Sequence, residues 1–462
     1  MLGCFPMDPT RKLLNTLLVP LALLAGANTA HAAETSAVLM ISIDGLHPDY
    51  VLKADQHQVR IPVLRQFAKN SAYASRVINV TPTVTYPNHT ALVTGGSPQE
   101  HGIYTNTVFD PLGLEAGAWN WYGDQITAPT LWDAAKAKGL TTGAVLWPVS
   151  VGHKAIDYNV PEYWRNKRPF DYHLMAAVST PRHFLDSVAE HTGHEYYAGG
   201  TGLELDAKST AVAIQMLEQG KVDLLTVHLV ALDGAQHEHG PLNEHSRPVL
   251  EKVDAMVGQM IQAHRRIHPD GTVVIASDHG FHPVNHQVHL NAAFAGAGLI
   301  TLTEDDKPKV RDWQVYAWNS GGSASIVLKD RNDTATLARV RQILKDLAAD
   351  PANGIASVLE GQEAIDDGAL PQASFLVDAR AGFAMGSALR GKVITPTTRT
   401  TGAHGYRNTH PEMSSAFFIA GPGIRNGHDL GQIDIRQIAP TLADRLDLDL
   451  PSARLPVLPV DK

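Results

Sequence analysis

Cysteine is almost absent from this sequence, since the chain of 462 residues contains only Cys4. One cysteine excludes a disulfide framework and a zinc site built from several thiolates. Any zinc-like ion must therefore be held by histidine and carboxylate side chains, and the chain contains 23 histidines. Such a composition suits metal sites made of nitrogen and oxygen ligands.

Positive charge is also scarce. The chain has 38 Lys and Arg against 47 Asp and Glu, which gives a formal net charge of −9. Nucleic-acid-binding proteins gather basic residues on one face. The acidic balance therefore argues against a nucleic-acid-binding surface.

Long hydrophobic runs are missing as well. The main apolar run follows Arg11 and Lys12, is short and broken, and ends in the small residues of Ala30–Ala33. This pattern is typical of a signal peptide, with an uncleaved anchor as the alternative. We expect residues 1–33 to be removed near Ala32/Ala33, which leaves a cysteine-free periplasmic or secreted chain without a membrane span.

The rest of the chain alternates apolar runs with segments of helical spacing. Strands are predicted at 37–43, 77–80, 143–147, 223–230, 272–277 and 416–420, and helices at 61–69, 130–138, 210–218, 247–264 and from Asp434 to about 445. This alternation predicts an α/β fold with a mostly parallel sheet covered by helices on both faces. The length suits one large domain with an insertion, or two domains.

Three predicted strands run into an aspartate, namely Asp44, Asp233 and Asp278. An aspartate in such a place is often a turn or cap residue, but the carboxyl ends of parallel strands line one binding crevice. Histidines accompany them: His237 follows Asp233 by four residues, His279 adjoins Asp278, and His404 lies in a glycine-flanked loop. Together these side chains can hold two zinc-like ions that act on a phosphoryl group.

The stretch from Val80 to Asn106 supplies a possible nucleophile. Its β-branched run ends at Thr85-Tyr86-Pro87, and a helix is predicted to begin at the proline. The Thr85 hydroxyl would then lie at a helix N-terminus, which attracts phosphate, although a threonine there is commonly a plain cap. Ligation by zinc could hold this hydroxyl as an alkoxide nucleophile.

These motifs, read together, resemble one enzyme family. They are D-G at Asp44, T-Y-P-N-H around Thr85, H-G-I-Y-T-N ending at Asn106, D-x-x-x-H-x-x-G-P at Asp233, S-D-H-G at Asp278 and H-G-Y at His404. The set resembles the nucleotide pyrophosphatase/phosphodiesterase family of the alkaline phosphatase superfamily, from about residue 37 to 446. Without the cysteine-rich and nuclease-like domains of animal members, the chain is similar to the compact bacterial type.

The resemblance implies a role for each motif. Thr85 would be the nucleophile of a covalent phospho-threonine intermediate, and Asn106 would bind a phosphoryl oxygen with help from the Tyr86 N–H. One Zn²⁺ ion would be bound by Asp233, His237 and His404. The other would be bound by Asp44, Asp278 and His279, with Thr85 in contact with it.

The resemblance also implies an alkaline-phosphatase-like catalytic domain over residues 34–282 and 401–462, with a smaller α+β cap at 283–400. Tyr86 stands where the family often has phenylalanine, and its ring could stack on a base or a lipid head group. Tyr158, Tyr163 and Trp164 are candidates for the second aromatic residue of a clamp around a nucleobase, unless they belong to the core. His239 is interpreted as an outlying or solvent histidine rather than a ligand.

Sequence reasoning leaves three functions open. A two-zinc phosphodiesterase or nucleotide pyrophosphatase is favoured, because no cation lies close in sequence to Thr85 or Asn106 to hold a doubly charged monoester. A threonine-type alkaline phosphomonoesterase of the periplasm is the first alternative, and a non-catalytic metal-binding protein is the second. The expected partner is a small-molecule phosphodiester or nucleotide. The sequence does not indicate which diester is cleaved, or the oligomeric state.

Overall fold

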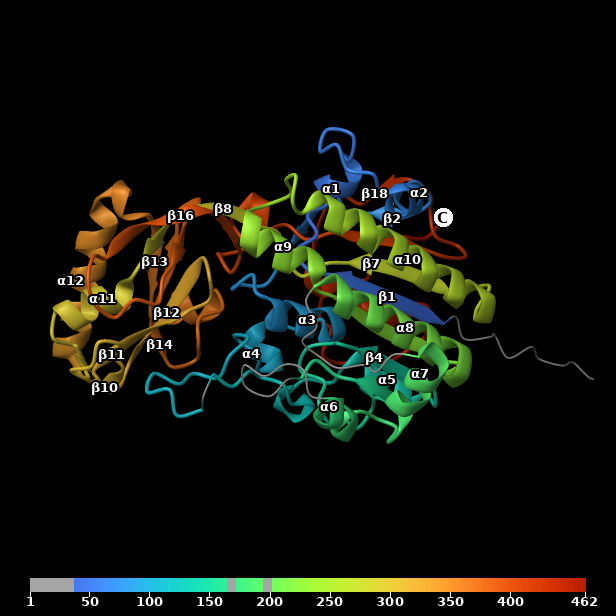
Figure 1. Ribbon diagram of the computed structural model, residues 1–462, viewed down its shortest axis with the longest axis horizontal. Coiled ribbons are helices and arrows are strands. Elements are labelled where there is room, and N and C mark those ends of the chain that lie inside the picture. The colour runs from blue at the N-terminus through green and yellow to red at the C-terminus, as the bar shows by residue number, and fades with distance from the viewer. Residues whose placement is uncertain (1–36, 116, 164–171, 194–201) are drawn as a thin grey trace, which may run out of the picture. The chain divides into compact units, whose positions relative to one another are not determined.

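A computed structural model describes residues 37–115, 117–163, 172–193 and 202–462. Its main sheet has eight strands (Figure 1). In spatial order they are β18 (His428–Asp429), β2 (Ala72–Tyr73), β17 (Phe417–Ala420), β7 (Thr272–Ala276), β1 (Val38–Ile43), β6 (Leu224–Leu229), β4 (Thr142–Val145) and β5 (Tyr158–Val160). The five from β7 to β5 are parallel, and β17 runs antiparallel to β7. The predicted fold class is confirmed.

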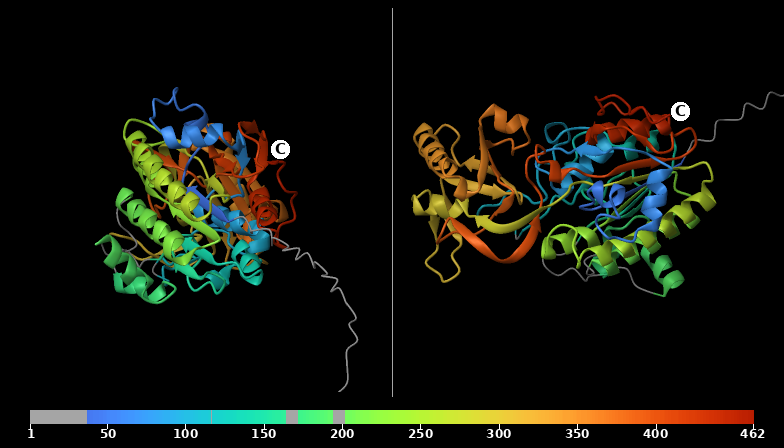
Figure 2. Two further views of the ribbon diagram at one scale, coloured as in Figure 1. Left: turned by 90° about the vertical axis from the view of Figure 1, so that its right-hand side faces the viewer. Right: turned by 90° about the horizontal axis from the view of Figure 1, so that it is seen from above.

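Helices cover both faces of this sheet because each central strand alternates its side chains between two cores (Figure 2). On β1, Leu39 and Ile41 pack with α2 (Pro62–Lys69), α8 (Leu203–Gly220) and α10 (Arg247–Ile267). Met40 faces the other way, toward α3 (Thr85–Thr94), α5 (Leu131–Ala137) and α14 (Ile438–Arg445). A strand that is apolar on both faces is thus buried on both faces.

A second group of strands lies beside the main sheet, at the left of Figure 1. Its antiparallel sheet has the order β11-β12-β14-β13, formed by Val315–Asn319, Ser323–Leu328, Ala373–Ala379 and Ile355–Glu360. The strands β8 (His282–Val288) and β16 (Ile394–Ala403) lead from the main sheet to this group and back, and they pair antiparallel with each other. The antiparallel sheet falls inside the predicted cap segment, whose limits of 283 and 400 stay a prediction.

Further helices and strands complete the described fold. In the first half they are α1 (Asp49–Leu52), β3 (Arg76–Ile78), α4 (Pro98–His101), α6 (Tyr172–Val178), α7 (Phe184–Thr192) and α9 (Ala231–His239). In the second half they are α11 (Leu290–Gly296), β9 (Ile300–Leu302), β10 (Val310–Trp313), α12 (Thr334–Ala349), α13 (Gln362–Asp366), β15 (Gly382–Met385) and β19 (Gln432–Asp434). Single 3₁₀ turns lie at Gly123–Gln125, Pro351–Asn353, Pro411–Met413 and Ile435–Gln437.

Two local predictions next to the site were wrong. Asp233 does not end a strand: β6 stops at Leu229, and Asp233 lies in the first turn of α9. The helix starts so early because the Asp206 carboxylate accepts hydrogen bonds from the N–H groups of Val230 (2.8 Å) and Ala231 (3.0 Å). The helix predicted from Pro87 begins at Thr85, which places the proline inside its first turn.

Two further expectations concern membranes and export. Among the residues that the structure describes, none of the helices has the length and apolar character needed to cross a bilayer. The predicted signal peptide at 1–33 lies outside the described residues.

Candidate active site

The first cluster of predicted ligands forms at the carboxyl ends of the neighbouring strands β1 and β7. The Nε2 atom of His279 lies 3.2 Å from Asp44 Oδ1 and 3.2 Å from Asp278 Oδ2. All three side chains are buried, and one ligand atom from each lies within 4.8 Å of the others. We call Asp44, Asp278 and His279 the buried cluster.

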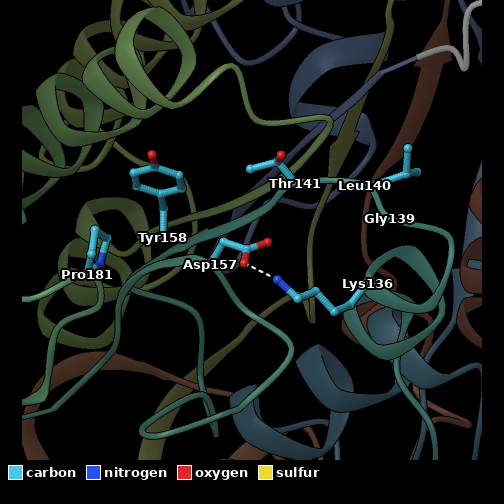
Figure 3. A pocket seen from close by; sticks show the side chains of 7 residues that line it. All are labelled: Lys136, Gly139, Leu140, Thr141, Asp157, Tyr158 and Pro181. Carbon is cyan, nitrogen blue, oxygen red and sulfur yellow. Dashed lines mark hydrogen bonds and ion pairs between the residues drawn. The ribbon is translucent and has the colours of Figure 1, made fainter.

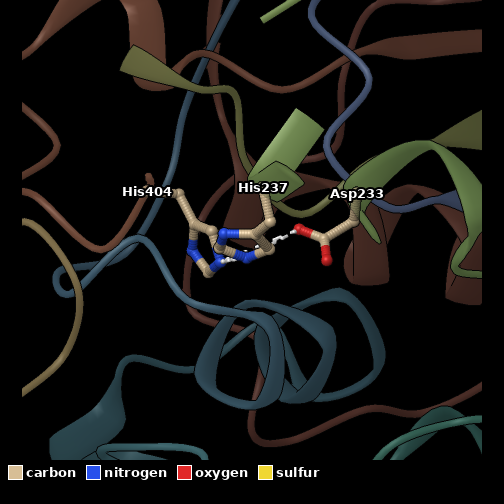
Figure 4. Close-up of side chains that lie close together, drawn as sticks. All are labelled: Asp233, His237 and His404. Carbon is tan, nitrogen blue, oxygen red and sulfur yellow. Dashed lines mark hydrogen bonds and ion pairs between the residues drawn. The ribbon is translucent and has the colours of Figure 1, made fainter. Parts of the chain in front are cut away.

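The second cluster consists of Asp233 and His237 on α9 and His404 just after β16 (Figure 4). Asp233 Oδ1 lies 3.4 Å from His237 Nε2 and 3.8 Å from His404 Nε2. The four-residue spacing of Asp233 and His237 brings both to one face of the helix, as predicted from their spacing. We call this set the outer cluster. It adjoins the buried cluster, because the rings of His279 and His404 stack with centroids 3.6 Å apart.

The hydrogen bonds of the outer cluster leave its ligand atoms without donors. His237 Nδ1 faces Gly402 O at 3.1 Å, and His404 Nδ1 faces Thr83 O at 2.9 Å. A carbonyl oxygen only accepts, so both Nδ1 atoms donate, and in the neutral form of each ring Nε2 carries a lone pair. These two Nε2 atoms lie 3.1 Å apart beside Asp233 Oδ1, which has no hydrogen-bond partner among the described residues. A cation satisfies all three atoms at once.

The ionisation of these groups also suits metal binding. Burial, together with the nearby His237, lowers the pKa of His404 to about 4, and burial holds the pKa of His279 well below its usual value. Both rings are therefore neutral ligands at neutral pH. Burial is the main cause that raises the pKa of Asp44 and of Asp278, and repulsion from neighbouring carboxylates raises it further. A positive ion between them would reverse this repulsion.

Thr85 is the first residue of α3 and is buried against the cluster. Its Oγ1 lies 3.5 Å from His279 Nε2. The next N–H, that of Tyr86, donates to Asn106 Oδ1 at 2.9 Å. The family resemblance implies that the Tyr86 N–H helps to bind a phosphoryl oxygen. In the structure the N–H orients the Asn106 side chain, so that the amide nitrogen is left as a donor, and a share of the Tyr86 N–H in binding a phosphoryl oxygen stays a prediction.

The aromatic candidates pack against other aromatic rings of the protein. The Tyr86 ring is fully buried and packs edge-on against Trp119, with centroids 5.2 Å apart. It has no exposed face for stacking on a substrate, so that expected role does not fit the structure. Tyr163 packs against Trp121, and Tyr158 packs against Phe184. Trp164 lies outside the described residues.

Several supporting residues were missed by sequence reasoning. Asp206 caps α9, Gln236 joins α9 to the turn after Asp44, and His228 Nε2 lies 2.9 Å from Asp44 Oδ2. Glu162 is buried near Tyr86, and burial raises its pKa to about 7. Only Gln236 had a local signal, because its place between Asp233 and His237 on a helix turns it inward. The other contacts join residues far apart in the chain.

Other pockets and polar groups lie apart from this arrangement. A surface pocket of about 380 Å³ lies beside α5 and the edge strand β5 and contains the ion pair of Lys136 with Asp157 (Figure 3). None of the predicted metal ligands lines it, and neither do Thr85, Tyr86 and Asn106; of the aromatic candidates, Tyr158 does. His239 packs on His245, with ring centroids 4.5 Å apart, and is not part of the outer cluster.

Fold and site together define an alkaline-phosphatase-like α/β protein with two adjoining carboxylate–histidine clusters. The family model described as type I phosphodiesterase / nucleotide pyrophosphatase matches residues 38–407, and the chain belongs to this family.

Curated relatives are similar over most of this chain. Human ectonucleotide pyrophosphatase/phosphodiesterase family member 1 is 22% identical over 90% of this chain and 40% of its own length. Venom phosphodiesterase 2 of Crotalus adamanteus is 22% identical over 90% of this chain and 46% of its own length. The chain therefore spans less than half the length of these two relatives.

Solved structures share the fold. Human ectonucleotide pyrophosphatase/phosphodiesterase 5 has a TM-score of 0.63 at 20% identity, covering 91% of this chain and 96% of that one. The murine protein, solved as an inactive threonine-to-alanine variant in complex with AMP, has a TM-score of 0.62 at 21% identity, again covering 91% of this chain and 96% of that one. At this level of identity the likeness concerns the fold.

Proposed function

We propose that this protein is a two-zinc phosphodiesterase or nucleotide pyrophosphatase that works through a phospho-threonine intermediate. The observation that carries the proposal is the meeting of two metal-ligand clusters beside the hydroxyl of Thr85. Membership of the family supports the reaction class. The inactive threonine variant of the murine neighbour, and its AMP ligand, support a threonine nucleophile and a nucleotide-type substrate.

Each cluster would hold one ion. Asp233, His237 and His404 supply one carboxylate and two imidazoles, whereas Asp44, Asp278 and His279 supply two carboxylates and one imidazole. Zinc accepts both sets and leaves open positions for Thr85 and substrate oxygens. When bound, the ions would polarise the phosphoryl group and favour the deprotonated form of the threonine hydroxyl.

The residues of the chain then have separate tasks. Thr85 Oγ attacks phosphorus, and the bond to the leaving alkoxide or phosphate breaks as the Thr85–phosphorus bond forms. Water later cleaves that bond, which returns the hydroxyl and releases the second product. Asn106, oriented by the Tyr86 N–H, donates its amide to a phosphoryl oxygen as negative charge develops there.

The proposal extends to substrate and place. A diester carries one negative charge on its phosphate, which suits a neutral donor such as Asn106 better than a doubly charged monoester does. The substrate would be a small-molecule phosphodiester or nucleotide. The predicted signal peptide, and the names of the relatives as ectoenzymes and venom proteins, support a secreted or periplasmic location.

The test compares initial rates of the zinc-loaded protein on three substrates. They are p-nitrophenyl phosphate, the p-nitrophenyl ester of thymidine 5′-monophosphate, and p-nitrophenyl phosphorylcholine. We expect kcat/KM for a diester to exceed that for the monoester by orders of magnitude. If kcat/KM is highest for p-nitrophenyl phosphorylcholine, the substrate class is lipid head groups. A monoester that wins makes the protein a threonine-type phosphatase and refutes the diesterase proposal.

The nucleophile is tested by Thr85→Ala, with Thr94→Ala as the matched control. Thr94 is a buried threonine at the other end of α3, and its hydroxyl donates to Thr90 O at 2.8 Å. We expect Thr85→Ala to lose nearly all turnover while both metal ions stay bound, and Thr94→Ala to keep it. Activity above a few per cent in Thr85→Ala, measured on protein with two zinc ions per chain, would show that the nucleophile is another group.

A further inference from the structure

Gln236 is a fully buried side chain in the middle of α9, between the two ligands that this helix supplies to the outer cluster. Its Nε2 donates to the carbonyl oxygen of Gly45 at 2.9 Å. Its Oε1 accepts from the hydroxyl of Tyr50 at 2.9 Å. Both ends of the amide are thus paired inside the protein, which is costly to disturb because a buried polar group without a partner loses its solvation.

The hydrogen bond to Gly45 connects the two backbone segments that carry the two clusters. Gly45 directly follows Asp44, and its own N–H donates to Asp278 Oδ1 at 3.2 Å, so this turn belongs to the buried cluster. The helix α9 carries Asp233 and His237 of the outer cluster. The Gln236 side chain therefore connects α9, which carries two ligands of the outer cluster, directly to the turn that carries Asp44 of the buried cluster.

The link has little room to move. A Cβ atom added at Gly45 would lie 2.8 Å from Gln236 Nε2 and 2.7 Å from the Phe281 ring, so the backbone packs closely on the amide. A Cβ atom added at Gly402, in β16, would lie 2.3 Å from the backbone carbonyl oxygen of Gln236. Dense packing of this kind transmits small displacements instead of absorbing them.

Tyr50 fixes which way the amide points. The Tyr50 oxygen is also approached by the Leu242 N–H at 3.4 Å, so its own proton is free to be given to Gln236 Oε1. Gly45 O, a carbonyl, can only accept. A flipped amide would place its oxygen against the Gly45 carbonyl oxygen and would lose that bond.

We propose that Gln236 is a positioning residue that sets the spacing between the two metal clusters. The inference rests on the proposed function. Two-metal catalysis needs ions about 3.5–4 Å apart, and a displacement of about 1 Å can cost about 10²-fold in rate. Gln236 touches neither substrate nor ion, and it acts through α9 and the Gly45 turn.

The test uses Gln236→Met, which keeps the volume of the side chain and removes both hydrogen bonds. Outer partners of metal ligands typically contribute 10–100-fold to activity or metal affinity, so we expect kcat to fall about 10–100-fold with KM within about threefold. Rates are measured on protein shown to hold two zinc ions per chain. Gln215→Met is the matched control, because Gln215 is a buried glutamine on α8 away from both clusters, and we expect wild-type rates.

A second measurement reads the spacing without turnover. The zinc-free protein is loaded with Mn²⁺, and electron paramagnetic resonance records the magnetic coupling between the two ions, which depends on their separation. We expect Gln236→Met to change this coupling and Gln215→Met to leave it as in the wild type. A purely structural role of Gln236 would lower thermal stability but would not change the coupling.

Tyr50→Phe provides the second variant. It removes the donor to Gln236 Oε1 and leaves the bond to Gly45, so we expect a smaller effect in the same direction and no further loss when combined with Gln236→Met. If Gln236→Met does not fold, Tyr50→Phe decides. Wild-type kcat and coupling in the variants overturn the inference while the proposed function stands. A wild-type protein that binds no metal pair and cleaves no phosphate ester overturns both.

Discussion

Replacing Asn106 by aspartate is a sharp test of how the site handles developing charge. The two side chains have nearly the same shape, and the aspartate can still accept the hydrogen bond that the Tyr86 N–H gives to Oδ1 at 2.9 Å. The amide nitrogen, however, is exchanged for a second carboxylate oxygen. The donor that should face a phosphoryl oxygen thereby becomes a like charge.

The expected loss has two parts. Removing one such donor, as in Asn106→Ala, costs about 10²-fold in kcat. Placing a negative charge about 3 Å from a charged phosphoryl oxygen adds about 5 kcal/mol at an effective dielectric constant of 20, or roughly three to four further powers of ten. We therefore expect the order wild type, Asn106→Ala, Asn106→Asp, with a wide gap between the two variants.

The assay is kcat for the p-nitrophenyl ester of thymidine 5′-monophosphate, with zinc content measured for each variant. Equal zinc content separates the charge effect from metal loss. If Asn106→Asp is as active as Asn106→Ala, the amide does not face the phosphoryl group, and the assignment of Asn106 as an oxyanion donor is refuted.

Two further predictions concern the metal and the acid range. Removing metal with a chelator should abolish hydrolysis and lower Tm, because the buried carboxylates of Asp44 and Asp278 then repel each other. Added zinc should restore both activity and Tm. Hydrolysis that persists without metal would contradict the two-metal site. Burial lowers the pKa of His264 from 6.5 to about 4, so its contribution to stability is complete above pH 6.5 and is lost as the pH falls toward 4, by roughly 3 kcal/mol. Urea unfolding of the metal-free protein should show this loss in the wild type and not in His264→Leu, and parallel pH profiles would refute it.

The sequence predicted the parts of this site that depend on local pattern. An apolar run that ends in Asp44 or Asp278 is a strand with a polar end, and parallel neighbours bring such ends together. Helical spacing likewise placed Asp233 and His237 on one face. The family resemblance then assigned the set to metal binding. The roles of the individual site residues stay predictions.

Long-range contacts were beyond the reach of the sequence. The early start of α9 depends on Asp206, which lies about one helix upstream and caps N–H groups that no local pattern points to. The Tyr86 ring is covered in part by Trp119, and the sequence does not show that these two residues meet. The hydrogen bond from Gln236 to Gly45 joins residues 191 positions apart. Each of these depends on packing, which local propensity does not encode.

The strands β8 and β16 leave and re-enter the main sheet side by side, at the edge that carries the candidate ligands, with His282 and Ala403 as direct partners. The segment between them therefore begins and ends at neighbouring points. It also touches the rest of the chain elsewhere, as in the ion pair of Asp367 with Arg407 and the hydrogen bond from the Gly322 N–H to His404 O at 2.7 Å. A segment whose two ends lie together can be lengthened or shortened at its outer turns without pulling the flanking candidate ligands apart. In evolutionary terms, the outer part of this segment can change, and with it the shape of the neighbouring surface, while the candidate ligands on both sides of it keep their places.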